Sequence, residues 1–465
     1  MKTSLITFAA LLLVGCTKGG SGSDSGADSG GSEVIPDAPW PEWILQPWVW
    51  EDESTQESAT GLVDGYIAND IPVGAIIIDS PWATGYSTYE WDTDLYPDPQ
   101  GMIDEFHSKG VKVFIWTVPG INTDVPELYE YAASKGYFMQ SNADSGPTLV
   151  DWWKGEGSLI DYFNPEAVEW WHGLVDQTLA LGIDGWKCDG LDFSAISAKY
   201  SPFLGRDVTR PEYSERYYRD FHDYTREVLG NDRVSTFRPV DNYGTDIGGE
   251  GVEFGPKDIT WAGWVGDQDG TFGGIEAALN NMFWSDHGGY TMFGSDIGGY
   301  RNDGSELGRS KEVMIRWSQL GALSAIMENG GSGEHRPWIF DEETNDIYRR
   351  FTKLHVDLIP YLMEEGALAF HEGRGLMDFT EIPDTADKTY SYFLGRDIFV
   401  VPVLDETGGV LVNVPEGSWV FAFDPDEVFE GPSSVHMSVP ISSYPLFIRE
   451  GSEVSETVLD SLSGA

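Results

Sequence analysis

The sequence has little cysteine and little positive charge, and each shortage excludes a class of protein. Two cysteines, Cys16 and Cys188, occur among 465 residues, so a disulfide framework is excluded. Lys and Arg number 28 against 77 Asp and Glu, a formal net charge of −49. Because DNA binding needs cations that neutralise phosphates, this balance excludes nucleic acid as a partner.

The acidic residues are spread along the chain rather than gathered in one tail. We interpret them as a solubility surface suited to salty water, with a specific cation-binding role as the alternative. A polyanionic chain also favours a substrate that is neutral or weakly charged.

Sequence motifs for metals and phosphates are missing as well. The eight histidines are scattered, without the HxH or HExxH spacing of metal sites. There is no Gly-rich phosphate loop with a lysine and no GxSxG turn. We therefore expect no metal site and no cofactor.

Long apolar runs are absent after the N-terminus. The stretch from Leu5 to Val14 follows Lys2, is too short to span a bilayer, and precedes Gly15-Cys16. It predicts a lipoprotein signal peptide over residues 1–16, with Cys16 as the lipidated residue. An ordinary secretory signal with an incidental cysteine is the alternative.

Residues 17–40 are rich in Gly, Ser and Asp and predict a flexible tether. The expected location is the bacterial cell envelope, on its periplasmic or cell-surface face. The membrane is then contacted only through the lipid.

What the sequence does have is a regular alternation of apolar runs and amphipathic stretches from Ile44 onward. This pattern is typical of βα units around a parallel sheet, and eight strand candidates predict a (β/α)8 TIM barrel over residues 41–374. Asn164 as N-cap and Pro165 predict one helix, and residues 346–362 predict another. The predicted strands are Leu45–Trp50, Val73–Asp79, Val111–Trp116, Asp184–Asp189, Arg233–Arg238, Ile259–Trp264, Tyr290–Phe293 and Leu323–Met327.

Two parts of the chain depart from this alternation. Residues 80–99, 140–164 and 190–211 are expected to be long loops, which are usually functional. After residue 375 short alternating runs appear between Gly and Pro turns. They predict a small antiparallel β-sandwich over residues 375–465.

Two aspartates stand where predicted strands end. Asp189 ends Trp186-Lys187-Cys188-Asp189, and Asp267 follows Trp264-Val265-Gly266. Catalytic groups of barrel enzymes lie at these ends, and two carboxylates are what glycosidic cleavage requires. We expect Lys187 or Arg238 to keep Asp189 ionised, and apolar neighbours such as Trp264 to raise the pKa of Asp267. The alternative is that both aspartates simply cap helices.

Further candidates surround these two. Asp79 ends the second predicted strand, and Asp296 lies in a Gly-rich segment, so each is expected to accept sugar hydroxyls. Trp116 and Trp264 are candidates for contact with the sugar, because tryptophan offers a wide amphipathic surface. His335 and Arg336 are candidate substrate ligands, with a surface loop braced by an ion pair as the alternative.

These segments, in this order, resemble glycoside hydrolase family 31, the α-glycosidase family. The resemblance runs from about residue 48 to 419 and includes Ile76-Ile77-Ile78-Asp79, the strands ending at Asp189 and before Asp267, Gly294-Ser295-Asp296-Ile297-Gly298-Gly299-Tyr300 and Arg316-Trp317-Ser318-Gln319-Leu320-Gly321-Ala322. It implies a retaining double displacement with Asp189 as nucleophile and Asp267 as acid/base. It also implies that Asp79, Asp296 and Arg238 hold the terminal sugar.

The chain departs from the family pattern in three places. The large β-sandwich that usually precedes the barrel is not expected here, and Asp192 stands where a glutamate is usual. Glu328-Asn329-Gly330 replaces the usual Arg-x-His after the eighth strand, which puts the bound sugar in doubt.

The sequence thus predicts an anchored, exo-acting α-glycosidase that hydrolyses terminal α-linked sugars of an oligosaccharide or glycoside. Two alternatives stay open: transglycosylation on the same scaffold, and a non-catalytic surface glycan-binding lipoprotein. The oligomeric state and the sugar are not predicted.

Overall fold

Short parallel strands form the wall of a barrel in the computed structural model, which describes residues 35–190, 197–241, 252–253, 255–380 and 389–463. Cys16, the signal peptide, most of the tether and Asp192 lie outside the described residues. The barrel strands are β1 (Trp48–Glu51), β2 (Ala75–Ile78), β3 (Lys112–Thr117), β7 (Gly185–Cys188), β10 (Val234–Thr236), β13 (Gly263–Trp264), β14 (Phe293–Gly294), β15 (Asp296–Ile297) and β16 (Glu328–Asn329).

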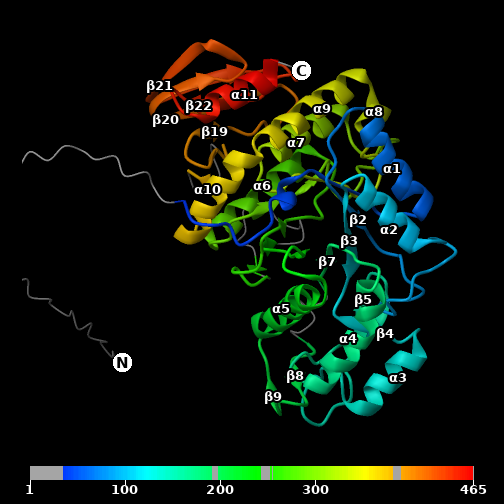
Figure 1. Ribbon diagram of the computed structural model, residues 1–465. Helices are drawn as coiled ribbons and strands as arrows, with labels where there is room; N and C mark the ends of the chain where they lie inside the picture. The colour runs from blue at the N-terminus through cyan, green and yellow to red at the C-terminus, as the bar shows by residue number, and fades with distance from the viewer. Residues whose placement is uncertain (1–34, 191–196, 242–251, 254, 381–388, 464–465) are drawn as a thin grey trace, which may run out of the picture. The chain divides into compact units, whose positions relative to one another are not determined.

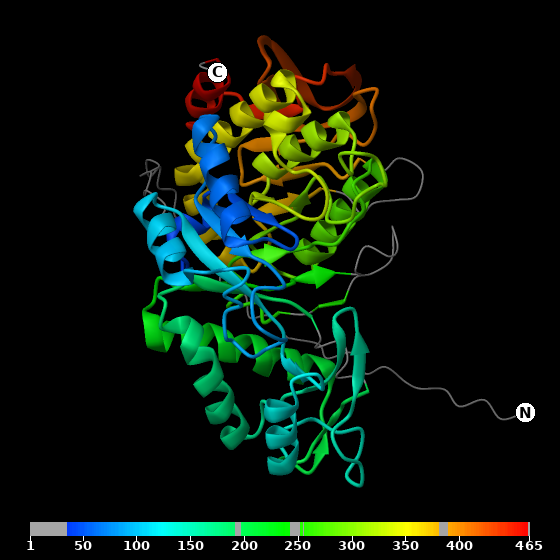
Figure 2. The same ribbon diagram turned by 90° about the vertical axis from the view of Figure 1, so that its right-hand side faces the viewer.

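Pairing between neighbouring strands closes the sheet into a barrel. The order β10-β7-β3-β2-β1-β16-β15 forms one sheet of parallel pairs, and β13 pairs with β14 in parallel. A parallel bridge from Phe237 to Gly263 joins the end of β10 to β13, and only Ser295 separates β14 from β15. The predicted (β/α)8 barrel is therefore confirmed, and all strands end on the same side (Figures 1 and 2).

The eighth strand lies further along the chain than predicted. Residues 323–327 are not a strand, because α7 (Lys311–Ala322) ends there and a buried apolar connection follows. The strand β16 comes directly afterwards and carries Glu328. A continuous apolar run does not distinguish a buried connection from a buried strand, and this explains the displacement.

Helices cover the outside of the barrel, and their ends follow local sequence signals. Asn164 accepts a hydrogen bond from the Glu166 N–H, as predicted for the start of α4. The single helix predicted over residues 346–362 is two helices, because Pro360 lacks the N–H that would continue the first one. The remaining helices of the described barrel region are η1 (Glu42–Leu45), α1 (Gln56–Ala68), α2 (Pro99–Ser108), α3 (Pro126–Lys135), α4 (Pro165–Leu179), α5 (Arg210–Leu229), α6 (Phe272–His287), α8 (Pro337–Phe340), α9 (Glu342–Asp357) and α10 (Ile359–Glu372).

Small strands occupy the segments between barrel strands. The largest group is the antiparallel sheet β4-β6-β5, which lies between β3 and α4 in the chain. The loop predicted over residues 140–164 therefore contains regular structure. These small strands are β4 (Gly120–Asn122), β5 (Val150–Trp152), β6 (Gly155–Leu159), β8 (Tyr200–Ser201), β9 (Arg206–Asp207), β11 (Val240–Asp241) and β12 (Val252–Glu253).

The C-terminal part is an antiparallel β domain, as predicted. Its strands β17 (Met377–Phe379), β18 (Tyr392–Leu394), β19 (Ile398–Val400), β20 (Gly409–Phe421), β21 (Asp424–Ser438) and β22 (Leu446–Arg449) form one hydrogen-bonded sheet, followed by α11 (Val454–Ser463). Within the long strand β20 the register with β21 shifts between Val414 and Gly417. In Figure 1 this sheet and α11 lie beside α9, which α11 contacts.

Arg316 of α7 attaches this sheet to the barrel. Its guanidinium donates to the carbonyls of Ser443, Val439 and Pro440 at 2.7, 3.1 and 3.2 Å. Gln319 donates to the carbonyl of Ile441 at 2.8 Å. The Arg316-Trp317-Ser318-Gln319 segment is thus an inter-domain clamp.

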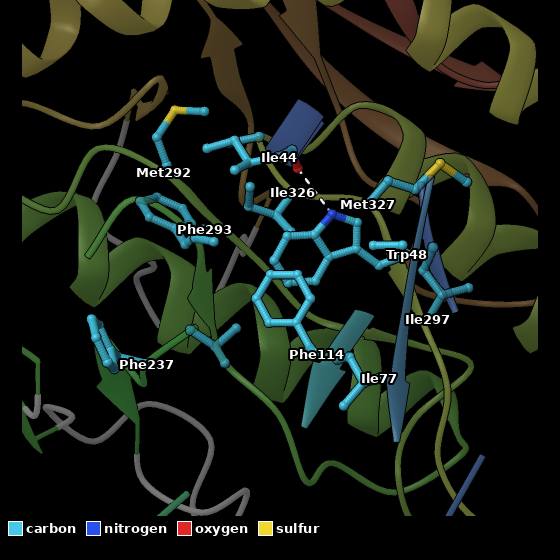
Figure 3. Packing of buried hydrophobic residues seen from close by; sticks show 14 of the residues in the cluster. Ile44, Trp48, Ile77, Phe114, Phe237, Met292, Phe293, Ile297, Ile326 and Met327 are labelled. Atoms are coloured by element: carbon cyan, nitrogen blue, oxygen red, sulfur yellow. Dashed lines mark hydrogen bonds between the residues drawn. The ribbon is translucent and has the colours of Figure 1, made fainter. Parts of the chain in front are cut away.

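Large apolar side chains fill the barrel below the strand ends. The rings of Trp48 and Phe114 lie 4.5 Å apart, and the Trp48 indole donates to the Ile44 carbonyl at 3.1 Å (Figure 3). Ile77, Phe293 and Met327 are buried in the same cluster. The interior is therefore a packed core, which leaves the strand ends as the place for a site. Among the described residues no helix is long and apolar enough to cross a membrane.

Candidate active site

A cavity of about 320 Å³ opens at the ends of the barrel strands. This volume falls in the range of small-molecule sites. Its lining residues come from several strand ends and loops: Trp50, Asp52, Asp79, Ser80, Trp116, Trp153, Lys154, Lys187, Asp189, Trp264, Asp267, Tyr300 and Arg301. Six of the residues predicted for the site are in this lining.

Asp189 directly follows β7 and lies at the bottom of the cavity. Its carboxylate accepts hydrogen bonds from the Trp116 indole N–H at 3.1 Å and the Gly190 N–H at 2.7 Å. Arg238 Nη2 lies 3.3 Å from the same carboxylate. Burial nonetheless raises the pKa of Asp189, and the negative charge of Asp267 adds to this, while the Arg238 guanidinium opposes it. Arg238 and Lys187 lower the pKa of Asp189, as we expected of nearby cations, but burial outweighs them.

Asp267 follows β13 with its backbone in the left-handed region, at a φ of 72°. A non-glycine residue held in this conformation is uncommon and needs support from its surroundings. The closest partner of its carboxylate is Arg238 Nη2 at 2.5 Å, rather than the apolar neighbours that we expected. Its side chain is 20% exposed, so it faces the cavity.

Arg238 therefore joins the two carboxylates. Its side chain is fully buried, and its guanidinium carbon lies 3.7 Å from the centre of the Trp264 ring. Because one nitrogen contacts both acids, Asp189 Oδ1 and Asp267 Oδ2 are no more than about 6 Å apart. Retaining glycosidases hold their two carboxyl groups about 5–5.5 Å apart, whereas inverting enzymes need about 6.5–9.5 Å.

Asp296 lies behind this pair and does not line the cavity. Its two carboxylate oxygens accept from the Trp264 indole N–H at 2.8 Å and from the Asp267 N–H at 2.9 Å. It thus holds the strained Asp267 turn, and this position corrects our expectation that it accepts sugar hydroxyls. Burial raises the pKa of Asp296 to about 7.

Asp79 and Lys187 form a buried ion pair in the wall of the same cavity. Lys187 Nζ lies 2.9 Å from Asp79 Oδ2, and the Ser80 N–H donates to the other oxygen at 2.8 Å. The ammonium lies 3.5 Å from the Trp50 ring centre and 4.3 Å from the Trp264 ring centre. Cation–π contact of this kind offsets part of the loss of hydration. Lys187 thus pairs with Asp79, while Arg238 is the cation that contacts Asp189.

Glu328 is a buried acid beside this pair that the sequence analysis noted only as a departure. It pairs in register with Asp296 on the neighbouring parallel strand, so the two side chains share the inside of the barrel. Neither carboxylate oxygen has a hydrogen-bond partner of ordinary geometry, although the Trp50 indole N–H is near enough to lower its pKa slightly. Burial, with the nearby charge of Asp296, raises the pKa of Glu328 to about 8.

His335 and Arg336 are not brought into the cavity. His335 is buried beneath the turn after β16, with Nδ1 3.0 Å from the Ile297 carbonyl and 3.1 Å from Asn329 Oδ1. Arg336 donates to both carboxylate oxygens of Glu334, at 2.7 and 2.6 Å. The alternative of a loop braced by an ion pair therefore describes Arg336.

Several lining residues escaped the sequence analysis. Asp52 follows β1 as Asp79 follows β2, so its place at a strand end was a usable signal. Burial, with the nearby charge of Asp79, raises its pKa to about 6. Trp153, Lys154, Tyr300 and Arg301 come from turns whose direction no local pattern reveals.

Cys188 directly precedes Asp189 at the end of β7. It is fully buried and its thiol faces Tyr217 of α5, on the outside of the strand. Burial raises its pKa well above the usual value, which is typical of an unreactive thiol. Among the described residues no cluster of His, Cys, Asp or Glu has the geometry to hold a metal ion.

A parallel barrel with two closely spaced carboxylates at its strand ends is the arrangement found in glycosidases built on a TIM barrel. Comparison with known proteins names the family. The profile of the glycosyl hydrolases family 31 TIM-barrel domain matches residues 38–365, and that of the family 31 C-terminal domain matches residues 375–454. The chain belongs to glycoside hydrolase family 31.

Individual relatives are distant. An α-xylosidase of Emericella nidulans is 27% identical over 89% of this chain and 53% of its own length. An isomaltosyltransferase of Sporosarcina globispora is 24% identical over 89% of this chain and 40% of its own. The solved cycloalternan-forming enzyme from Listeria monocytogenes, with a pentasaccharide substrate, superposes with a TM-score of 0.77 at 21% identity, over 90% of this chain and 42% of that one. The chain spans about half the length of the curated relatives it matches.

Proposed function

We propose that the chain is an exo-acting, retaining α-glycosidase that hydrolyses the terminal sugar of an α-linked oligosaccharide or glycoside. One contact supports this above all: Arg238 Nη2 touches both Asp189 and Asp267 and keeps the two carboxylates within about 6 Å. A water molecule that acts from the far side of the sugar needs a wider spacing than this, so the spacing favours a mechanism in which one carboxylate is the nucleophile.

Asp189 is the nucleophile in this proposal. The indole N–H of Trp116, the Gly190 N–H and Arg238 aim its oxygens and favour the ionised form. A carboxylate oxygen forms a bond to the anomeric carbon while the bond from that carbon to the glycosidic oxygen breaks. The product of this first step is a glycosyl ester of Asp189.

Asp267 is the acid and then the base. Its proton passes to the departing glycosidic oxygen in the first step. In the second step the Asp267 carboxylate takes a proton from water, the water oxygen bonds to the anomeric carbon, and the ester to Asp189 breaks. Two displacements at the same carbon return the α configuration.

The terminal sugar is held by groups around these two acids. The Asp79–Lys187 pair supplies both acceptors and donors for hydroxyls, and Trp50 and Trp264 supply apolar surface. The cavity of about 320 Å³ suits release of single sugars from a chain end.

A screen of the purified protein tests the proposal. The substrates are the nitrophenyl α-glycosides of glucose, galactose, xylose and sulfoquinovose, and Asp189→Ala and the isosteric Asp189→Asn are the controls. Turnover of one sugar that falls at least about 10³-fold in both variants is the expected result. Turnover that survives in both variants would refute the assignment of the nucleophile.

Transfer to a sugar acceptor is the second candidate, because one relative is named an isomaltosyltransferase. The product profile at high substrate concentration separates the two reactions. Hydrolysis gives only monosaccharide and the leaving group, whereas transfer gives longer products. The third possibility, a glycan-binding protein without activity, would show binding but no turnover, unchanged in Asp267→Ala.

We also propose that the protein is an exported bacterial lipoprotein of the cell envelope, with Cys16 as the lipidated residue. The apolar stretch from Leu5 to Val14 and the Gly/Ser-rich segment after Cys16 support this. The Cys16→Ser variant is expected to move from the membrane fraction to the soluble fraction. An unchanged distribution would refute lipidation at Cys16.

A further inference from the structure

The tip of a β-hairpin lies at the mouth of the active-site cavity. In the antiparallel pair β5–β6, Trp152 and Gly155 are opposite each other, so Trp153 and Lys154 form the two-residue loop between them. Both loop residues line the cavity that contains Asp189 and Asp267. This hairpin belongs to the segment between β3 and α4, near α3 and β4 in Figure 1.

The loop is held in a fixed position by side chains on three sides. Asn122 accepts from the Trp152 indole at 2.8 Å and donates to the Lys154 carbonyl at 2.9 Å. The Trp152 ring stacks on Trp116, with an angle of 7° between the planes and 6.4 Å between the centres. Because the Trp116 indole also donates a hydrogen bond to Asp189, the position of the hairpin is tied to the position of that carboxylate.

The side chains of the loop are presented to the mouth. Trp153 is 52% exposed, although its edge-to-face contact with Trp152 is only 5.0 Å between ring centres. Lys154 Nζ lies 3.1 Å from Glu53 Oε1, which joins the hairpin tip to the segment after β1. A half-exposed tryptophan that its neighbours fix beside a cavity offers a rigid amphipathic surface to a ligand.

We propose that Trp153 and Lys154 form the subsite for the leaving group, and that the leaving group is a second sugar ring. This inference rests on the proposed function, since the leaving group begins at the oxygen that Asp267 protonates. With the terminal sugar between Asp79 and Asp189, the next ring lies toward the mouth, where Trp153 stands. The indole face fits the C–H face of a pyranose, and the Lys154 ammonium and the Asp52 carboxyl line the same cavity with groups that bind hydroxyls.

The polar flanks distinguish a sugar from a flat aromatic leaving group. An aryl group would use the Trp153 ring alone, and it would leave Lys154 and Asp52 without partners on the substrate. A pyranose can stack on the Trp153 indole and at the same time form hydrogen bonds with Lys154 and Asp52. Lys154 keeps its ion pair with Glu53 and still has donors for hydroxyls, since an ammonium has three.

Paired substrates with the same terminal sugar test this subsite in the full-length protein. The α-fluorides of glucose, xylose and galactose have no ring on the leaving side. The α-1,3-, α-1,4- and α-1,6-linked disaccharides of the same sugars on glucose have one. For Trp153→Ala we expect kcat/KM to fall about tenfold or more on the disaccharide, mainly through KM, and less than about twofold on the fluoride. Trp153→Phe is expected to recover most of the loss.

Phe203→Ala is the matched control, because Phe203 is 54% exposed and does not line the cavity. It should change neither substrate. Equal loss on fluoride and disaccharide in Trp153→Ala would refute the subsite while the proposed function stands. So would turnover of a fluoride but of no disaccharide, or a greater loss on the nitrophenyl glycoside than on the disaccharide. Wild-type turnover of no fluoride or disaccharide, together with no turnover of any of the four nitrophenyl α-glycosides, would refute the proposed function, and the subsite with it.

Discussion

Single side chains in this site work through shared partners rather than alone. Asp296 holds both the Trp264 indole and the Asp267 backbone, and Arg238 contacts Trp264 and both catalytic candidates. A change at one of these residues therefore moves several others. The leaving-group dependence of the rate separates the roles of these residues, because among them only the acid, Asp267, has a role that depends on the leaving group.

Asp267→Ala is expected to lose activity selectively. A nitrophenyl leaving group needs little protonation, so kcat/KM on a nitrophenyl glycoside should fall far less than on a disaccharide. The two losses should differ by a factor of roughly 10² or more. Asp267→Asn, which keeps the size of the side chain, should show the same selectivity. Equal losses on both substrates would remove Asp267 from the acid role.

Glu328 makes the stability of the folded protein depend on pH. Its pKa is about 8 in the folded state, against 4.5 for an ordinary glutamate, so the folded state binds its proton more tightly. The resulting stabilisation is complete below pH 4.5 and is lost as the pH rises through about 8. Glu328→Gln removes this dependence, because a neutral amide replaces the acid in nearly the same volume.

Denaturant unfolding at two pH values measures the effect. Relative to the wild type, Glu328→Gln should gain on the order of 1 kcal/mol or more in unfolding free energy between pH 5 and pH 8.5. Glu364→Gln, at an exposed acid on α10, is the control and should show no such gain. A constant difference between wild type and Glu328→Gln across this range would show that Glu328 is not held as a neutral acid.

At the scale of elements, strand ends were predictable and side-chain partners were not. Asp79, Asp189 and Asp267 were found because an apolar run followed by an acid is visible in one dimension. That Arg238 bridges two acids depends on the neighbouring positions of β7, β10 and β13 around the barrel, which the local pattern of each strand does not contain. His335 and Arg336 were misplaced because the turn after β16 buries one and pairs the other with Glu334. The Trp153 loop was missed because its hairpin lies in a segment predicted to lack strands.

Replacement of Arg316 tests how the C-terminal sheet is attached to the barrel. Arg316→Ala leaves the carbonyls of Val439 and Pro440 without their donor and empties a buried volume. We expect a loss of roughly 2–4 kcal/mol in the stability of the attachment, seen as earlier protease cleavage and a lower Tm. Arg206→Ala is the control, since Arg206 makes an exposed ion pair with Glu212, and should change stability by less than about 0.5 kcal/mol.

At the scale of the whole molecule, charge is the dominant feature. The few cations are shared among many acids, as when Lys311 contacts both Asp341 and Glu343. With a formal net charge of −49, the remaining acids repel one another across the surface. This repulsion opposes the compact state, and dissolved salt screens it.

Salt should therefore stabilise the protein. Raising NaCl from about 0.05 to 1 M shortens the screening length to about 3 Å and should raise Tm by several degrees. Thermal unfolding followed by circular dichroism measures this. A Tm that falls with NaCl would mean that specific ion pairs outweigh the general repulsion.

The configuration of the first product tests the central claim most directly, namely that two carboxylates joined by Arg238 carry out a double displacement. Proton NMR of the anomeric signals, recorded within the first minutes of turnover, identifies the sugar anomer before it equilibrates in water. The α anomer should appear first, because two displacements at one carbon restore the starting configuration. Initial release of the β anomer would mean a single displacement by water and would contradict the role given to Asp189.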